Sequence, residues 1–221
     1  MQDEILNSGF ARTGRLLDRE QCLELRSLYP DPANFRSRVL MSQYRFGRGE
    51  YQYFRYPLPS AVQGLRERLY AELAPAANKW AEALGVQVRY PEELSAFLER
   101  CHGAGQNKPT PLMLKYGAGD FNCLHQDVYG PVVFPFQVII GLSDPESEYT
   151  GGELMLVEQL PRAQSKGQVL SLRQGEGVAI TTRQRPARGT RGIYRVNMRH
   201  GVSPVHSGER FTLGVIFHDA E

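Results

Sequence analysis

The second half of the sequence, from Leu112 onward, alternates short apolar runs with clusters of turn residues, and no long helical periodicity returns. Short apolar segments separated by Gly, Pro, Asp and Ser are typical of antiparallel strands joined by tight turns. The predicted strands are Leu112–Tyr116, Phe134–Leu142, Glu153–Val157, Val169–Leu172, Val178–Thr182, Ile193–Met198 and Phe211–Phe217. Strands of this number and spacing predict a double-sheet jelly roll or a barrel.

Residues 1–105 carry helical periodicity instead. Apolar residues recur near helical spacing in Leu16–Leu28 and Leu65–Leu84, and Pro91–Cys101 opens with proline and two acids before an apolar stripe. We expect Pro75 to interrupt the second of these helices, because proline lacks the N–H group that a helix interior needs. The apolar stripes are expected to pack on one face of a sheet.

A length of 221 residues, with 41% hydrophobic and 23% charged residues, fits one domain with a sizeable core. We therefore expect residues 1–221 to form a single α+β domain. In this domain a helical N-terminal region, 1–105, packs on a jelly-roll core, 106–221.

The sequence lacks the features of a membrane or secreted protein. No stretch approaches the ~18 to 20 uncharged apolar residues that span a bilayer, and the chain opens with acid where a secretory signal carries base. Cys22, Cys101 and Cys123 show no metal-type spacing, and their odd number argues against a disulfide framework. These features predict a cytoplasmic protein with no membrane partner, and they leave its oligomeric state open.

Residues 35–56 interleave arginines with aromatic residues, and Glu50 is the only acid among them. The basic and aromatic members include Arg45, Arg48, Arg55, Tyr44, Phe46, Tyr51 and Tyr53. Such a mixture can stack bases and hold phosphates. An edge hairpin whose aromatic rings pack on the core explains the same pattern equally well.

Charge is segregated along the chain despite a net charge of only +2. The segment from Gln159 to Gly208 contains nine basic residues and a single acid, Glu176. A basic face follows from this pattern, and arginine suits planar anions such as carboxylate and phosphate. One group within it is Arg183, Arg185, Arg188 and Arg191.

Two histidines and an aspartate form a candidate metal site. His125 and Asp127 lie two residues apart, so on an extended backbone both side chains point to the same face. His200, far along the chain, can add a second imidazole from another strand. Two imidazoles and one carboxylate on one face of an octahedral ion are the ligand set of non-haem Fe(II) oxygenases, because three positions remain open.

The order of these motifs resembles that of the Fe(II)/2-oxoglutarate-dependent dioxygenases over about the last half of the chain. The pattern comprises Tyr116 with Gly119, His125 with Asp127, Gly151-Gly152-Glu153, and His200 followed ten residues later by Arg210 and then Thr212. The resemblance implies a double-stranded β-helix that uses Fe(II), 2-oxoglutarate and O2, with iron at the open end.

The resemblance also assigns the co-substrate site. The far carboxylate of 2-oxoglutarate needs a cation, and the guanidinium fork of Arg210 beside the Thr212 hydroxyl suits that task. Tyr116 can donate its phenol to the same carboxylate, and Asn122 can donate an amide to the co-substrate.

His200 and His206 compete for the third ligand position. If Ser207-Gly208 turns a hairpin, His206 lies almost opposite Arg210 and leaves no room for 2-oxoglutarate. His200 lies about five residues, or roughly 16 Å of strand, further back, a gap that the arginine and the co-substrate can span together. The expected ligand is therefore His200, with His206 on the surface.

The C-terminal part, Gly189–Gly201 and Phe217–Ala220, resembles a bacterial AlkB-like group associated with oxidative demethylation of alkylated DNA. This resemblance implies that residues 35–56 cover a flipped base and that Arg183, Arg185, Arg188 and Arg191 form a loop that contacts phosphate. RNA or a single strand is a further possibility. The segment from Pro204 to Arg210 instead resembles prolyl hydroxylases, so a protein is the alternative substrate. A non-catalytic jelly-roll binding module is the third hypothesis.

Overall fold

The protein is described here by a computed structural model that covers residues 1–145, 147–190 and 192–221. Its helices are α1 (Gln2–Ser8), α2 (Arg19–Ser27), α3 (Ser60–Ala83) and α4 (Leu94–Gly103), with short 3-10 turns η1 (Pro32–Asn34) and η2 (Met41–Tyr44). Its strands are β1 (Phe10–Arg15), β2 (Phe35–Leu40), β3 (Gly47–Arg48), β4 (Glu50–Phe54), β5 (Leu112–Tyr116), β6 (Phe121–His125), β7 (Phe136–Gly141), β8 (Tyr149–Gly151), β9 (Leu154–Gln159), β10 (Lys166–Leu170), β11 (Glu176–Thr181), β12 (Gln184–Gly189), β13 (Gly192–Val202), β14 (Val205–Gly208) and β15 (Arg210–Ile216).

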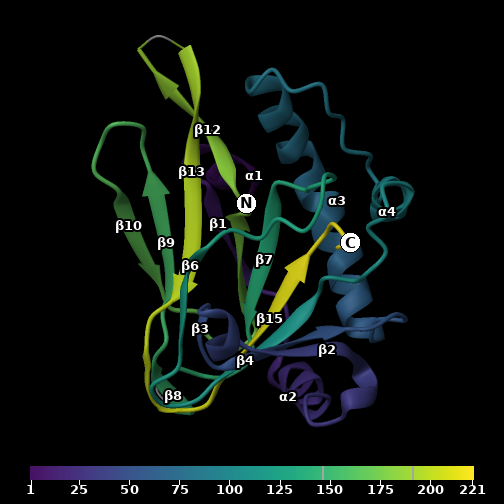
Figure 1. Cartoon of the computed structure of the whole chain (residues 1–221), viewed down its shortest axis with the longest axis vertical. Helices are drawn as coiled ribbons and strands as arrows, with labels where there is room; N and C mark the ends of the chain where they lie inside the picture. Colours follow the sequence, from purple (N-terminus) through teal and green to yellow (C-terminus); the bar gives the residue numbers. More distant parts are fainter. Residues whose placement is uncertain (146, 191) are drawn as a thin grey trace.

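These strands form two main antiparallel sheets, as the predicted jelly roll requires. The larger sheet has the order β1-β11-β7-β15-β5-β4-β2, and the smaller has the order β10-β9-β13-β6-β3, with β12 beside β13. A short third pair, β8 and β14, joins them at one end. Helices α3 and α4 lie on the outer side of the larger sheet, and the β12–β13 hairpin extends at the top of the view, where β12 lies beside α3 (Figure 1).

Helix α3 anchors the larger sheet because its apolar stripe is buried against it. Leu65, Leu69, Leu73 and Trp80 are buried, and the Trp80 ring meets Phe136 of β7 edge to face at 4.5 Å. Each such side chain contributes about 1.5 to 3 kcal/mol when fully buried. Pro75 lies inside this continuous helix. The predicted interruption is therefore wrong, because packing of the stripe on both sides of Pro75 outweighs one lost backbone hydrogen bond.

The N-terminal 105 residues also contribute strands, of which the sequence indicated only a possible edge hairpin within residues 35–56. Strand β1 pairs with β11, while β2 and β4 form the edge hairpin of the larger sheet. Phe35 and Phe54 of this hairpin stack in the core at 4.8 Å. Residues 35–56 thus contain the core-packing edge hairpin that was one of the two interpretations. The segment between its strands crosses to the smaller sheet, where β3 pairs with β6.

In the part of the chain that the structure describes, no helix combines the length and apolarity that crossing a bilayer requires.

Candidate active site

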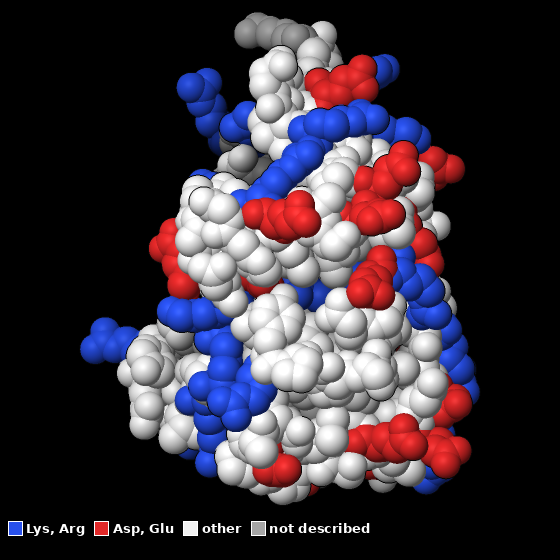
Figure 2. Space-filling model, turned by 90° about the vertical axis from the view of Figure 1, so that its right-hand side faces the viewer, with Lys and Arg blue, Asp and Glu red and all other residues white. Residues whose placement is uncertain are grey.

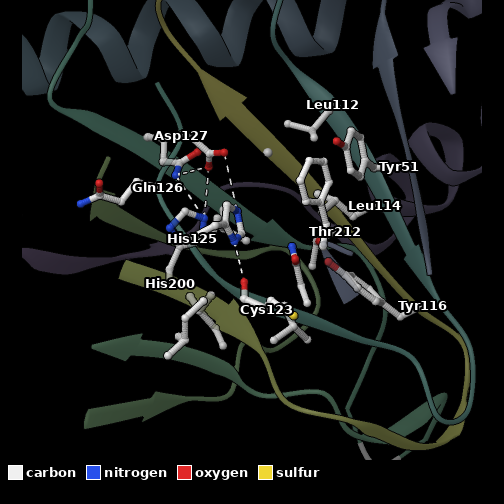
Figure 3. Close-up of a pocket in the computed structure, with 18 of the residues that line it drawn as sticks. Tyr51, Leu112, Leu114, Tyr116, Cys123, His125, Gln126, Asp127, His200 and Thr212 are labelled. Carbon is white, nitrogen blue, oxygen red and sulfur yellow. Dashed lines mark hydrogen bonds and ion pairs between the residues drawn. The ribbon is translucent and has the colours of Figure 1, made fainter. Parts of the chain in front are cut away.

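The three expected metal ligands converge between the two sheets. His125 ends β6, and His200 lies opposite it in the register of β13. Asp127 follows His125 after one intervening residue, and its carboxylate lies 3.1 Å from His200 Nε2 and 3.6 Å from His125 Nε2. All three donor atoms lie within 4.8 Å of one another. Figure 3 shows both imidazoles turned toward the Asp127 carboxylate.

Two residues that the sequence reading missed hold the Asp127 carboxylate. The Tyr129 hydroxyl donates to Oδ1 at 2.6 Å, and the Gln137 amide donates to Oδ2 at 2.7 Å. The Tyr53 hydroxyl donates in turn to Tyr129 at 3.1 Å. A signal for Gln137 was present, since it is a lone polar residue within the apolar run that forms β7. The contact through Tyr129 depends on the loop after β6 and has no local signal.

Electrostatics keep the Asp127 carboxylate charged and the His125 imidazole neutral. Burial alone would raise the pKa of Asp127, but hydrogen bonding and electrostatic attraction from His200, together with the Tyr129 hydrogen bond, outweigh burial and hold the pKa well below its usual range. Burial, followed by repulsion from His200, lowers the pKa of His125. The His125 Nδ1–H group can donate to the Cys123 carbonyl at 2.8 Å, which leaves the Nε2 lone pair directed at the site.

A cavity of about 340 Å³ opens beside these three residues. Its walls combine aromatic and aliphatic side chains with a few polar groups, as small-molecule sites do. The predicted site residues that line it are Tyr116, Asn122, His125, Asp127, His200, Arg210, Thr212, Arg45, Tyr51 and Tyr53. In Figure 3, Tyr116 and Thr212 lie on the opposite side of the cavity from the His-Asp-His set.

Arg210 is a buried cation whose guanidinium is available to a ligand. It opens β15 opposite Tyr116 of β5, and only 3% of its surface is exposed. Its Nε and Nη1 atoms, and the Tyr116 hydroxyl, have no hydrogen-bond partner among the described residues. Burial raises the pKa of Tyr116 to about 12, so this phenol remains a donor at neutral pH. Buried unpaired donors of this kind cost free energy unless an anion binds them.

The predicted Gly151-Gly152-Glu153 motif makes room for Arg210. Gly152 has a φ of +64°, and a Cβ atom at this position would lie 2.9 Å from Arg210 Cδ and 2.8 Å from Val205 Cγ2. The Gly152 N–H donates to the Pro204 carbonyl, and the Ser203 hydroxyl donates to Glu153. The motif therefore ties the start of β9 to the turn after β13 and leaves space for the arginine side chain.

His206 lies outside the site. It belongs to β14, which pairs with β8, and its side chain is exposed. The hairpin assumed at Ser207-Gly208 is absent in the described structure, because β13 ends at Val202 and β14 crosses to β8 before β15 begins. The expected surface position of His206 agrees with this path, although the assumed turn is wrong.

The arginines proposed for nucleic acid differ in their availability. Arg45 lines the cavity, and Arg48 is exposed on β3. Arg55 lies outside the cavity lining, with its guanidinium 3.5 Å from the Ala33 carbonyl. Figure 2 shows basic side chains gathered at the left of the lower half of the helix-bearing face, with acidic side chains at its lower right, and both signs of charge in the upper half.

The second arginine group lies on a strand rather than on the expected loop. Arg185 and Arg188 belong to β12, which pairs along its length with β13. Arg185 is held by Glu158 at 2.8 Å and is therefore not free for phosphate, whereas Arg183 and Arg188 are exposed. Arg191 lies outside the described residues.

The residues present fit the metal and co-substrate that the resemblance implies. Two imidazoles and a carboxylate match the donor set of Fe(II) oxygenases. The unpaired guanidinium of Arg210 lies in the same cavity, as a second anionic end of a dicarboxylate requires. A jelly roll with these two groups in one cavity has the architecture of the Fe(II)- and 2-oxoglutarate-dependent oxygenases, with O2 as the oxidant.

Comparison with known proteins then defines the particular family. Residues 49–220 match the model of the Oxygenase-NA family, described as "Oxygenase, catalysing oxidative methylation of damaged DNA". The match spans more than half of the chain, and the chain belongs to this family. Its membership in an oxygenase family argues against a non-catalytic binding module.

Two curated relatives are the uncharacterized proteins MT2286 and Rv2227 of Mycobacterium tuberculosis. Each is 52% identical over 167 residues, covering 76% of this chain and 72% of the relative. This identity shows that the two relatives and this chain belong to one sequence family.

Solved structures share the fold at low sequence identity. A Pseudomonas putida prolyl-4-hydroxylase has a TM-score of 0.57 at 15% identity, covering 100% of this chain and 97% of that one. A Trichoplax adhaerens prolyl hydroxylase with a hypoxia inducible factor peptide has a TM-score of 0.56 at 14% identity and covers 99% and 87%. A Burkholderia pseudomallei oxidoreductase of the 2OG-Fe(II) oxygenase family has a TM-score of 0.53 at 13% identity and covers 99% and 90%. These likenesses confirm the predicted jelly roll.

Proposed function

We propose that this protein is an Fe(II)/2-oxoglutarate-dependent dioxygenase that removes alkyl groups from nucleobases of DNA by oxidation. The observation that carries the substrate is the family match over residues 49–220, whose description concerns damaged DNA. An oxygenase reaction on an N-methyl group releases the carbon as aldehyde and leaves the free base. The structure supports the proposal with a cavity that holds both the His-Asp-His set and an aromatic wall.

In this proposal His125, Asp127 and His200 hold the iron. Arg210 with Thr212 binds the far carboxylate of 2-oxoglutarate, Tyr116 donates its phenol to the same group, and Asn122 faces the co-substrate from β6. When bound, iron with 2-oxoglutarate and O2 supplies the oxidising power for C–H hydroxylation, with succinate and CO2 as co-products.

The chain's own residues would orient the base and exclude water. Tyr51 and Tyr53 of β4 and Tyr129 line the cavity, and their rings meet edge to face at 5.4 Å and 6.2 Å. Aromatic walls of this kind suit a flat heterocycle that has left its stack. Tyr53 is held by its hydrogen bond to Tyr129, so this wall is fixed before substrate enters.

Phosphate contacts in this proposal come from arginines that the structure leaves free. Arg45 lines the cavity and Arg48 is exposed on β3, while Arg183 and Arg188 are exposed before and on β12. Neutralising Arg45 and Arg48 together should weaken binding and lower its dependence on salt, since each phosphate contact releases counterions.

The test supplies the protein with Fe(II), ascorbate, 2-oxoglutarate and one of two substrate sets. N-methylated oligonucleotides, single-stranded and double-stranded, DNA and RNA, should yield formaldehyde and succinate in equal amounts. Proline-containing peptides form the second set, because the sequence from Pro204 to Arg210 resembles prolyl hydroxylases. Turnover on a peptide, with no formaldehyde from any oligonucleotide, would contradict the proposal and identify a protein side chain as the substrate.

A further inference from the structure

Two exposed aromatic rings are stacked on each other, and one of them, Phe46, lines the cavity. Tyr44 ends η2, and Phe46 follows after one residue, with 57% and 48% of their surfaces exposed. Their ring centroids lie 5.5 Å apart at an interplanar angle of 20°, so the rings are stacked on each other. Both rings leave a large apolar area in contact with water. This exposure is unfavourable unless another molecule covers the rings.

The backbone holds this pair over the strand that carries the first metal ligand. The Phe46 carbonyl accepts from the Cys123 N–H at 2.8 Å, and Gly47 pairs with Asn122. Gly47 approaches β6 so closely that a Cβ atom would lie 2.3 Å from the Phe121 carbonyl oxygen. This backbone pairing therefore places the Phe46 ring in the cavity lining, with the Tyr44 ring stacked on it.

Two cations without acidic partners flank the rings. Arg45 lies between them in the sequence, has a φ of 59°, and lines the same cavity. Arg48 is exposed on β3. Neither forms an ion pair with a described acidic side chain, in contrast to Arg38, which is bound to Glu50. An aromatic face beside free guanidinium groups complements a base with its phosphate.

We infer that the segment Tyr44–Arg48, here named the stacking arm, binds the nucleotide next to the one whose base enters the cavity. The neighbouring base stacks on the Phe46 and Tyr44 rings, and the intervening phosphate lies between Arg45 and Arg48. This inference rests on the proposed function. The arm precedes residues 49–220, so its role does not derive from the family match.

Stacking on an exposed ring requires the neighbouring base to leave its partner strand. The stacking arm therefore favours single-stranded or locally unpaired nucleic acid over an intact duplex. It is tolerant of sequence, because every base has a π face.

The test measures binding by the full-length protein with Fe(II) and 2-oxoglutarate in the absence of O2. The probe is a single-stranded DNA oligonucleotide with 2-aminopurine beside one N-methylated base. Binding should quench the 2-aminopurine fluorescence. Phe46→Leu keeps apolar bulk but removes the ring face, and it should weaken binding about five- to hundredfold and abolish most quenching. Tyr44→Ala should act in the same direction.

Tyr194, an exposed tyrosine on β13, provides the matched control, since Tyr194→Ala removes an aromatic ring outside the cavity lining. Thermal denaturation of each variant checks its folding. If wild type releases formaldehyde while Phe46→Leu binds and quenches as wild type does, the role inferred for the stacking arm is wrong and the proposed function stands. If no oligonucleotide is bound or demethylated, both fail together.

Discussion

His125 on β6 and His200 on β13 are directly opposite partners in an antiparallel pairing, and their ring centroids lie 4.2 Å apart. Neighbouring strands hold both rings at a fixed separation before any metal binds. Asp127, the third residue of the candidate metal site, lies beyond the end of β6, and its carboxylate lies 3.1 Å from His200 Nε2. The site therefore depends on one register, since a shift of one residue would turn His200 to the other face.

Replacing either His125 or His200 should strongly weaken metal binding. We expect His200→Ala to lower Co(II) affinity at least hundredfold, because it removes one of three protein ligands. His206→Ala, which changes an exposed residue of β14, should bind as wild type does. Titration with Co(II), followed by its visible absorption, measures both. Equal loss in the two variants would show that the ligand assignment is wrong.

Arg210→Gln should raise the requirement for 2-oxoglutarate without an equal effect on metal. Its guanidinium is buried, and two of its nitrogens have no hydrogen-bond partner among the described residues, so the variant removes the buried cation proposed to bind the far carboxylate. The expected increase in KM for 2-oxoglutarate is about hundredfold, as for a buried charge pair deprived of one partner. The control is Co(II) affinity, which should change less than about threefold. Parallel loss of metal and co-substrate would contradict the role.

Gly152→Ala should also raise the requirement for 2-oxoglutarate, indirectly, by displacing the Arg210 side chain. The added Cβ would lie 2.9 Å from Arg210 Cδ, and a φ of +64° disfavours alanine as well. We expect the KM for 2-oxoglutarate to rise about tenfold. Gly119→Ala changes another glycine of positive φ, but its Cβ would meet no atom within 4 Å. That variant therefore separates backbone strain from displacement of Arg210.

The sequence predicted those parts of the site that depend on local spacing. Arg210 and Thr212 alternate along β15, so an extended backbone places both on one face. His125 ends β6 and Asp127 follows two residues later, and the same spacing brings both side chains to the site. It also predicted most strands of the second half. The cavity position of Arg45 was not predictable, because the segment that carries it crosses from one sheet to the other.

Predictions failed where tertiary packing overrides a local rule. Pro75 does not end α3, because the apolar stripe continues beyond it. Strand β12 contains Pro186 and exposed arginines, so its composition indicates a loop, yet it pairs with β13 along its whole length. β12 is an edge strand, and an edge tolerates both proline and charge.

Tyr129→Phe should weaken metal binding although Tyr129 is no ligand. Its hydroxyl donates to Asp127 Oδ1 at 2.6 Å and fixes the rotation of the carboxylate. Loss of such a supporting hydrogen bond costs about ten- to hundredfold in metal affinity. Tyr53→Phe removes only the bond from Tyr53 to Tyr129 and should cost less. If Tyr129→Phe binds Co(II) with unchanged affinity and spectrum, the hydroxyl does not position the ligand.

His218 should make the stability of the metal-free protein fall in mild acid. Burial, aided by Arg66 and opposed by Asp127 and Asp219, lowers the pKa of this histidine to about 4, against an ordinary 6.5. The unfolded chain therefore takes up a proton as the pH falls below about 6.5, whereas the folded chain takes it up only near 4. The free energy of unfolding should decrease through this window by about 3 kcal/mol and show no contribution from His218 above it.

His218→Asn isolates this contribution from the carboxylates that titrate in the same range. Nδ1 of His218 accepts from the Phe134 N–H at 3.3 Å, and the asparagine oxygen can take over that bond without titrating. Urea unfolding at pH 7.5, 5.5 and 4.5 should show the stability difference between wild type and variant shifting toward the variant as the pH falls. His206→Asn, at an exposed site, should leave the wild-type profile unchanged. A difference independent of pH would mean that His218 is not held neutral by its burial.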